Sequence, residues 1–201
     1  MNWKQKNLET YNKSAKDLAK YFRGIGPRIK YIDFAFKAAG NPKEAKILEL
    51  GCGDGRDAKA IVERADQYLG IDISEELVKL AKKHVPRGVF KVADAVEFDY
   101  PKNLDIIFAF ASLLHLDKNE VSVVLKKAGI ALKPGGVFYI SSKYRPFYEK
   151  EVKKDRFGKR LFYFYNADII RKLADECFEV IDEWREVVGH TEWFEVALRK
   201  I

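Results

Sequence analysis

Apolar and polar positions follow two different periods along the chain, and their alternation predicts an α/β fold. From residue 46 onward, short apolar runs typical of buried strands alternate with segments in which apolar residues recur at helical spacing. The predicted strands cover residues 46–50, 67–71, 88–92, 104–110, 136–142, 177–186 and 192–200. The predicted helices between them cover residues 56–65, 74–84, 118–132 and 166–175. This alternation indicates a parallel sheet between two helix layers, with a ligand site at the carboxyl ends of the strands.

Residues 8–39 precede the first predicted strand and show the apolar period of two helices. The break between them falls at residues 24–27, where two glycines and a proline interrupt the pattern. Helix starts are marked further along the chain by Ser74, which two glutamates follow, and by Asp117 with Glu120 at capping-box spacing. We expect the two N-terminal helices to cover the active-site edge of the sheet.

The last two predicted strands are joined by residues 187–191, which contain Gly189. A short glycine-containing link between two strand-like runs is typical of a β-hairpin. The end of the chain is therefore predicted to add an antiparallel pair to the sheet.

The most informative segment is the turn after the first strand, where Glu49 is followed by glycines at positions 51, 53 and 55. Glycine lets a backbone turn sharply and approach a ligand closely, and the helix start beyond it offers unpaired N–H groups. A dinucleotide-binding fingerprint would have its third glycine where this chain has Arg56. The register of the glycines therefore argues against a dinucleotide cofactor.

Acidic residues at later strand ends agree with a nucleotide site. Asp72 ends the second strand, 21 residues after Gly51, where a carboxylate accepts hydrogen bonds from ribose hydroxyls. Asp94 and Ala95 follow the third strand, and residues 132–140 close a helix and open the fifth strand through two glycines. The spacing of Asp72 does not by itself exclude a dehydrogenase, so that alternative stays open.

The E-x-G-x-G-x-G turn and the segments after it, over residues 47–142, resemble in order the motifs of the class I, Rossmann-like S-adenosylmethionine-dependent methyltransferases, in particular the small single-domain prokaryotic type. The resemblance implies an α/β fold with a seven-stranded, mostly parallel sheet, an antiparallel last strand, helices on both faces and extra N-terminal helices. It also implies S-adenosylmethionine as cofactor and S-adenosylhomocysteine as product. One domain is expected over residues 1–201, with a helical cap at 1–40, a cofactor-binding core at 41–142, a substrate lid at 143–165, and a C-terminal helix and hairpin at 166–201.

The resemblance further implies which residues surround the cofactor. Those of the glycine turn would hold its methionine moiety, namely Glu49, Gly51, Cys52, Gly53 and Gly55. Asp72 would bind the ribose, Ile73 an adenine face, and Asp94 with Ala95 the adenine edge. Phe110 and Ala111, just after the fourth strand, would line the site below the sulfonium.

His115 is the candidate catalytic residue, because it follows the fourth strand on the cofactor side and histidine can act as a base near neutral pH. Packing beside the next helix is the simpler interpretation of this histidine. The acceptor pocket is expected to come from the segments outside the core, with Tyr11, Tyr144, Arg145 and Tyr163 as candidate acceptor-binding residues. Each of these aromatic side chains would also serve as apolar packing in a lid.

Composition and charge narrow the picture. At 201 residues the chain suits one core, and its net charge of +7 is concentrated at residues 143–160, which hold eight Lys and Arg against three Asp and Glu. We hypothesise that this basic segment favours an anionic acceptor. No signal-like segment, membrane span or metal-ligand spacing is recognisable, so we expect a cytoplasmic protein without metal, with Cys52 and Cys177 reduced.

The favoured function is transfer of a methyl group to a small molecule by in-line displacement, as a monomer or homodimer with no membrane partner. The second interpretation is a methyltransferase that acts on RNA or protein and binds it through the basic segment. Nucleic acid is the less favoured partner. A non-catalytic subunit that binds S-adenosylmethionine is the third.

Overall fold

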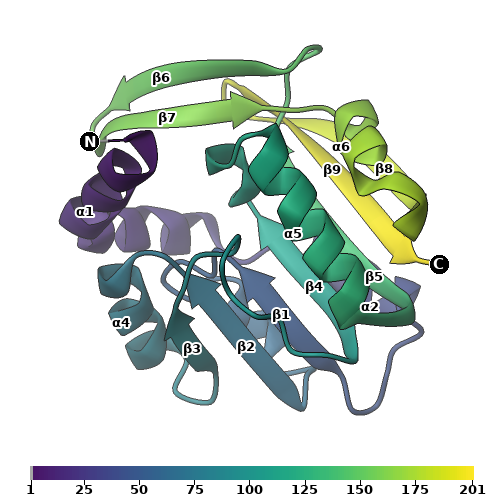
Figure 1. Ribbon diagram of the computed structural model, residues 1–201. Helices are drawn as coiled ribbons and strands as arrows, with labels where there is room; N and C mark the ends of the chain where they lie inside the picture. The colour runs from purple at the N-terminus through teal and green to yellow at the C-terminus, as the bar shows by residue number, and fades with distance from the viewer. Residues whose placement is uncertain (1) are drawn as a thin grey trace.

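Seven strands form one twisted sheet with the order β3-β2-β1-β4-β5-β9-β8 (Figure 1). The structure is a computed structural model that describes residues 2–201, apart from the side chain of Asp175. The strands are β1 (Lys46–Leu50), β2 (Gln67–Asp72), β3 (Val89–Val92), β4 (Leu104–Phe110), β5 (Leu132–Lys143), β8 (Phe178–Val188) and β9 (Thr191–Lys200). The first five run parallel, and β9 pairs antiparallel with both β5 and β8. The predicted mostly parallel sheet with an antiparallel last strand is confirmed.

Helices cover both faces of the sheet, as predicted. On one face lie α5 (Lys118–Ala131) and α6 (Ala167–Ala174), and on the other lie α2 (Ile29–Ala38), α3 (Ala58–Ile61) and α4 (Glu75–His84). Neighbouring strand residues divide between the two layers, because successive side chains point to opposite faces. Ile107 packs with the cluster under α5, and Ile106 packs with the cluster under α2 and α3.

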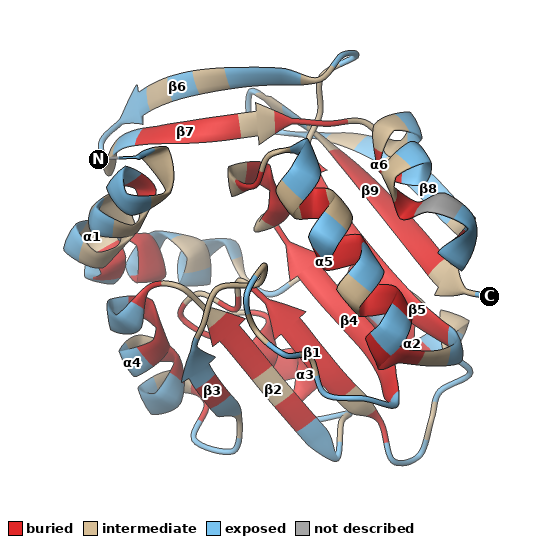
Figure 2. Cartoon of the chain, viewed as in Figure 1, coloured by how far each residue is buried: buried red, intermediate tan, exposed pale blue. Residues whose placement is uncertain are grey.

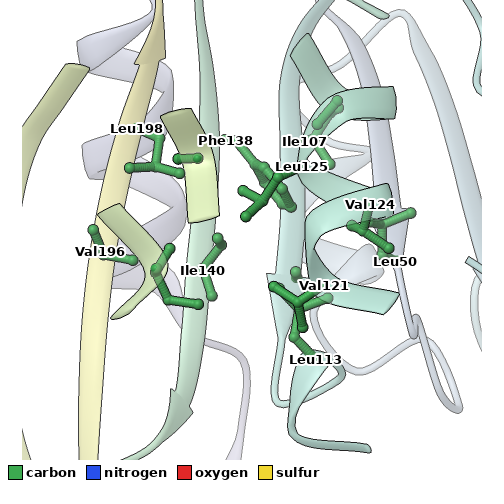
Figure 3. Packing of buried hydrophobic residues seen from close by; sticks show 14 of the residues in the cluster. Leu50, Ile107, Leu113, Val121, Val124, Leu125, Phe138, Ile140, Val196 and Leu198 are labelled. Atoms are coloured by element: carbon green, nitrogen blue, oxygen red, sulfur yellow. The ribbon is translucent and has the colours of Figure 1, made fainter. Parts of the chain in front are cut away.

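The central strand β4 is buried along its whole length, as Figure 2 shows. Its apolar run is continuous rather than alternating, as expected for a parallel strand covered on both faces. On the α5 face, Leu125 lies beside Phe138 and Val124 lies beside Leu50, within one buried cluster (Figure 3). Burying each such side chain stabilises the fold by roughly 1.5–3 kcal/mol. This packing holds the strand ends in fixed relative positions.

The N-terminal helix α1 (Trp3–Ile25) and a hairpin of β6 (Glu149–Asp155) and β7 (Gly158–Phe164) lie together beyond the carboxyl ends of the central strands (Figure 1). Side chains of α1 bond the backbone of β7: Asn7 both accepts from Leu161 N and donates to Leu161 O, at 2.9 and 3.0 Å. The hairpin is a separate two-stranded sheet. The sequence predicted a lid here but no strands, because charged residues interrupt the segment and the apolar residues of β7 pack against Leu114 rather than in the main sheet.

Several element bounds differ from the predictions. The first helix begins at Trp3 rather than at residue 8, and β5 begins at Leu132 rather than at residue 136. The helix expected over 56–65 is reduced to Ala58–Ile61, because the turn that contains Gly55 and the buried Asp57 occupies its first residues. The chain also contains two short 3-10 helices, η1 (Leu113–His115) before α5 and η2 (Asp175–Cys177) before β8. Among residues 2–201, no helix combines the length and apolar character needed to cross a membrane.

The predicted helix starts are confirmed. Ser74 Oγ accepts from the backbone N of Leu77 at 3.2 Å, and Asp117 with Glu120 forms a complete capping box at the start of α5.

Candidate active site

A cavity of about 170 Å³ opens at the carboxyl ends of β1, β2, β3 and β4. Ten of the eleven predicted cofactor residues line it: Glu49, Gly51, Cys52, Gly53, Asp72, Ile73, Asp94, Ala95, Phe110 and Ala111. The eleventh, Gly55, packs against α4, where a Cβ would lie 3.3 Å from Ala81 Cα. The glycine turn therefore has two tasks, since its first two glycines face the cavity and its third fits the loop against a helix.

The glycine turn has the backbone conformation that favours glycine. Gly51 and Gly53 have φ values of +72° and +55°. A Cβ on Gly51 would lie 2.4 Å from Ser112 Cβ, whereas a Cβ on Gly53 would meet no atom within 4 Å. Gly51 is thus required by close packing, and Gly53 leaves bare backbone against open space.

Asp72 holds the turn in place. One carboxylate oxygen accepts from Gly53 N at 3.0 Å and the other from Ser74 N at 2.8 Å. Burial raises the pKa of Asp72, and these two backbone donors act in the opposite direction. The carboxylate therefore links β2, the glycine turn and the start of α4 at the cavity wall.

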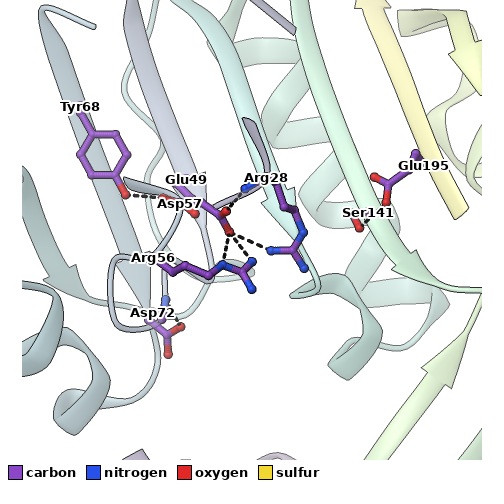
Figure 4. Close-up of polar contacts among 9 residues, drawn as sticks. Arg28, Glu49, Arg56, Asp57, Tyr68, Asp72, Ser141 and Glu195 are labelled. Carbon is purple, nitrogen blue, oxygen red and sulfur yellow. Dashed lines mark hydrogen bonds and ion pairs between the residues drawn. The ribbon is translucent and has the colours of Figure 1, made fainter. Parts of the chain in front are cut away.

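An ion cluster that sequence reasoning missed lies beside the turn (Figure 4). Asp57 accepts from Arg28 N and Arg28 Nη1, both at 2.8 Å, and from Arg56 Nη2 at 2.5 Å. Burial raises the pKa of Asp57, while the charge of Arg28 lowers it. All three side chains line the cavity. Arg56 and Asp57 could have been found from their place directly after the glycines, but Arg28 comes from the link between α1 and α2.

Glu49 is a buried carboxyl group at the end of β1. It accepts a hydrogen bond from Tyr68 OH, and its pKa lies well above the ordinary value because of burial and then the nearby charge of Asp57. Such a group is ready to receive a cationic or hydrogen-bond-donating ligand group.

The other end of the cavity lies between β3 and the start of α1. Lys4 Nζ lies 2.5 Å from Asp94 Oδ2 and 3.2 Å from Glu120 Oε1. Ile73 and Ala95 complete this end. The first turns of α1 thus cover the predicted adenine-binding residues, which the sequence alone did not reveal.

His115 and Tyr11, predicted separately, are in contact. Tyr11 OH lies 2.7 Å from His115 Nε2, and His115 Nδ1 lies 2.9 Å from the carbonyl oxygen of Leu161. Asn7 Nδ2 lies 3.1 Å from the same Nδ1 but already donates to Leu161 O. Because a carbonyl oxygen only accepts, we assign the proton to Nδ1, so that Nε2 accepts from Tyr11. Burial lowers the pKa of His115 to about 3. His115 is therefore a neutral acceptor that orients Tyr11 at the cavity wall, and Arg160 Nη1 lies 3.3 Å from the same hydroxyl.

The other three predicted acceptor-binding residues do not line the cavity. Tyr144 lies under the guanidinium of Arg185, with Arg185 Cζ 4.8 Å from the ring centroid. Arg145 packs over Phe164, and Tyr163 stacks on Tyr148. Tyr163 faces away because side chains alternate along β7, and its neighbours Phe162 and Phe164 point to the opposite face.

Another buried carboxyl group lies midway along β9. Glu195 accepts from Ser141 Oγ at 2.8 Å, and burial raises its pKa to about 7 (Figure 4). In the described part of the chain, no group of His, Cys, Asp and Glu side chains is arranged to hold a metal, and Cys52 and Cys177 are both free thiols.

Comparisons with known proteins agree with this fold and cavity. Residues 47–136 match the family model described as a methyltransferase domain. The chain is 26% identical over 156 residues to the ubiquinone biosynthesis O-methyltransferase of Pelagibacter ubique, covering 69% of this chain and 64% of that protein. It is 31% identical over 121 residues to the enzyme of the same name from Nitrosospira multiformis, covering 57% and 48%. The chain spans about half the length of the curated relatives it matches.

Solved structures show the same architecture. One is the 1,6-didemethyltoxoflavin-N1-methyltransferase of Burkholderia thailandensis, with a TM-score of 0.74 at 19% identity over 96% of this chain and 86% of that one. Another is an S-adenosylmethionine-dependent methyltransferase from Clostridium acetobutylicum, with a TM-score of 0.71 at 18% identity over 94% and 98%. The fold is the Rossmann-like α/β fold of these solved structures, with the cavity at the carboxyl ends of the strands. Residues 47–136 match a methyltransferase domain, in agreement with the motifs of the sequence.

Proposed function

We propose that this protein transfers the methyl group of S-adenosylmethionine to a small-molecule acceptor. The observation that carries the proposal is the order of groups along one cavity: the glycine turn, Asp72 and Asp94 at successive strand ends. The residues present fit such a cofactor. Gly53 leaves bare backbone against open space, and Ser112 Oγ lines the cavity buried and without a partner among the described residues.

In this assignment each part of the cavity binds one part of the cofactor. The Arg28 and Arg56 guanidinium groups would pair with the carboxylate of the methionine moiety, and Glu49 would receive its ammonium group. Asp72 would bind the ribose hydroxyls, and Asp94 the adenine amino group beside Ile73. When bound, the cofactor supplies an electrophilic methyl carbon on a sulfonium. The task of the protein is then to align the acceptor and exclude water, which for well-oriented reactants is equivalent to effective concentrations of ~10⁵ M or more.

Tyr11 is proposed to contact the acceptor, and His115 to position Tyr11. The hydroxyl of Tyr11 donates to His115 Nε2, so its remaining lone pair can accept from an acceptor O–H or N–H. His115 stays neutral, because burial lowers its pKa to about 3, and so holds Tyr11 in place without taking up a proton.

A small acceptor is favoured because α1 and β7 close over the cavity and because the matched relatives are named as O-methyltransferases of ubiquinone biosynthesis. Of the cap expected at residues 1–40, we propose that α1 covers the cavity, whereas α2 packs on a face of the sheet. We propose residues 41–142 as the cofactor-binding core, 143–165 as the acceptor lid and 166–201 as the closing helix and hairpin. We also propose that the acceptor is anionic, because the lid holds most of the excess positive charge. The cytoplasmic location and the monomeric or homodimeric state stay predictions.

The proposed cofactor is tested by calorimetric titration with S-adenosylhomocysteine, S-adenosylmethionine and NAD. We compare the wild type with Asp72→Asn, and use Asp99→Asn as the matched control because Asp99 is exposed. Both adenosyl ligands should bind, with at least tenfold weaker binding to Asp72→Asn and an unchanged control. Binding of NAD alone would overturn the proposal, and adenosyl binding without turnover on any acceptor would favour the non-catalytic subunit.

The RNA or protein methyltransferase is tested separately by nucleic-acid binding at two salt concentrations. Tight binding that weakens steeply with salt would favour this alternative, because phosphate contacts release counterions.

A further inference from the structure

Lys143, the last residue of β5, carries an ammonium group that is mostly withdrawn from water and lacks an acidic partner. Its Nζ lies 4.0 Å from the centroid of the Phe162 ring. Among residues 2–201, it forms no ion pair: the nearby carboxylates of Glu151 and Asp155 pair with Lys153 and Arg160 instead. Burying a charge without a counter-charge is costly. Burial, and then the charges of Lys153 and Arg160, lower the pKa of Lys143 to about 8.

Arg160 on β7 lies on the same aromatic ring and is buried. Its Cζ is 5.3 Å from the Phe162 centroid. Arg160 Nη2 pairs with Asp155 and Nη1 bonds Tyr11 OH, whereas Nε has no partner among the described residues. One guanidinium donor thus stays free in a buried position, where an unmade hydrogen bond destabilises the fold.

The two cations form one cluster with an excess of positive charge. Lys143, Lys153 and Arg160 face two carboxylates, those of Glu151 and Asp155, which leaves a net charge of +1. Like charges held together in a partly desolvated place repel one another more strongly than in water. An added oxyanion would relieve the repulsion, and within residues 2–201 the groups of the cluster without a hydrogen-bonding or ion-pair partner are Lys143 Nζ and Arg160 Nε.

The cluster adjoins the methyl-transfer end of the cavity. The Phe162 ring lies 4.9 Å from the His115 ring and packs in one small apolar cluster with Ala111. His115 and Ala111 both line the cavity. Trp193, paired across the sheet with Lys143, belongs to the same apolar cluster. Phe162 therefore contacts both cations and His115, which places the cations next to the wall of the cavity where the acceptor is proposed to react.

We propose that Lys143 and Arg160 form an oxyanion subsite that binds a carboxylate or phosphate group of the acceptor beside Phe162 and Trp193. Its assignment to the acceptor rests on the proposed function, whereas its affinity for anions does not. The neighbouring Arg145 is less suited because it pairs with Glu149 at 3.8 Å. The positive charge of the lid is therefore specific at one place, the cluster of Lys143 and Arg160, where cations outnumber carboxylates.

The test is calorimetric titration of the full-length protein, free and saturated with S-adenosylhomocysteine, with three probes: benzoate, phenyl phosphate and neutral benzamide. Lys143→Met removes the cation and keeps its length, and Lys143→Arg restores the charge. Lys150→Met is the matched control, because Lys150 pairs with Tyr163 and so lies on the other face of the hairpin. At least one anion should bind the wild type and Lys143→Arg. Its affinity for Lys143→Met should be at least tenfold lower than for the wild type, and its affinity for Lys150→Met should be within twofold of the wild type.

Each other outcome has a defined meaning. Equal binding of benzamide and the anions, no binding of either anion to the wild type, or an equal loss in Lys150→Met would overturn the subsite. Comparison of benzoate with phenyl phosphate decides between a carboxylate and a phosphate. Unchanged affinity of Lys143→Met for S-adenosylhomocysteine shows that the variant is folded. If S-adenosylhomocysteine fails to bind any variant while the anion titration behaves as expected, the proposed cofactor is wrong and the subsite stands.

Discussion

Gly51→Ala, compared with Gly53→Ala, should separate two reasons for glycine in the turn: backbone strain at positive φ and steric overlap of an added Cβ. At φ = +72° any residue with a Cβ adopts a strained backbone, and here the new Cβ would also lie 2.4 Å from Ser112 Cβ. Gly53→Ala is the matched comparison, since Gly53 has φ = +55° but no atom within 4 Å of an added Cβ. The two variants therefore share the backbone strain and differ in the overlap.

The expected losses follow from these two contributions. A left-handed conformation costs roughly 1–2 kcal/mol for a residue with a Cβ. Overpacking in a closed site typically adds about 1–3 kcal/mol. We therefore expect Gly53→Ala to lower the free energy of unfolding by about 1–2 kcal/mol and Gly51→Ala by about 2–5 kcal/mol. Adding Ser112→Gly to Gly51→Ala should recover the overlap contribution, because it removes the Cβ that the new methyl group meets.

Urea unfolding of the ligand-free variants measures the stability differences, and calorimetry with S-adenosylhomocysteine measures binding. Gly53→Ala should lose more affinity than stability, because its methyl group enters open space at the cavity. Equal destabilisation by Gly51→Ala and Gly53→Ala, or no recovery with Ser112→Gly, would refute the packing argument.

Three further predictions concern groups that the fold buries. Glu195→Gln should stabilise the protein at pH 8 by up to about 3 kcal/mol. The pKa of Glu195 is about 7 in the folded protein and about 4.5 in the unfolded chain, so the wild type loses stability as pH rises between these values. Urea unfolding between pH 4.5 and 8 should show the stability difference between variant and wild type growing and then levelling. The depressed pKa of His115, about 3, predicts the opposite trend with pH. As pH falls below about 6.5, the free energy of unfolding of the wild type should drop by about 1.4 kcal/mol per pH unit relative to that of His115→Gln. Parallel stability profiles of the two proteins would contradict this. Asn7→Ala leaves Leu161 N without its side-chain acceptor and removes one of the two side-chain donors to Leu161 O, so we expect a loss of about 1–3 kcal/mol in unfolding experiments. Release of S-adenosylhomocysteine should be faster in stopped-flow traces, and an unchanged release rate would show that α1 does not control access.

Much of the lining of the cavity at the strand ends could be predicted from the sequence. Its residues stand at the ends of consecutive strands, and parallel strands bring their carboxyl ends to one edge of a sheet. Asp72 and Asp94 are far apart in the chain but were predictable neighbours for this reason, as were the glycines between β1 and α3. Gly55 was the exception, because spacing alone does not reveal which face of a loop packs against a helix.

The hairpin segment that packs on α1 was predictable only in outline. Residues 143–165 were recognisable as a basic, aromatic segment, but their hairpin pairing was not, and pairing decides which side chains point inward. Tyr163 was chosen from composition, whereas the register of β6 and β7 turns Phe162 and Arg160 toward the cavity side. A shift of one residue in such a strand exchanges its two faces.

The sequence by itself determined the class of fold, the order of the strands' motifs and the type of cofactor site, because these depend on local periodicity and on short motifs. Only the tertiary structure decided that Arg28 joins Asp57, that Tyr11 bonds His115 and that Lys143 lies beside Arg160. Each of these contacts joins segments whose distance in the chain is unrelated to their distance in space. Their burial also sets the protonation of His115 and Glu195, since desolvation depends on the surrounding packing rather than on neighbours in the sequence.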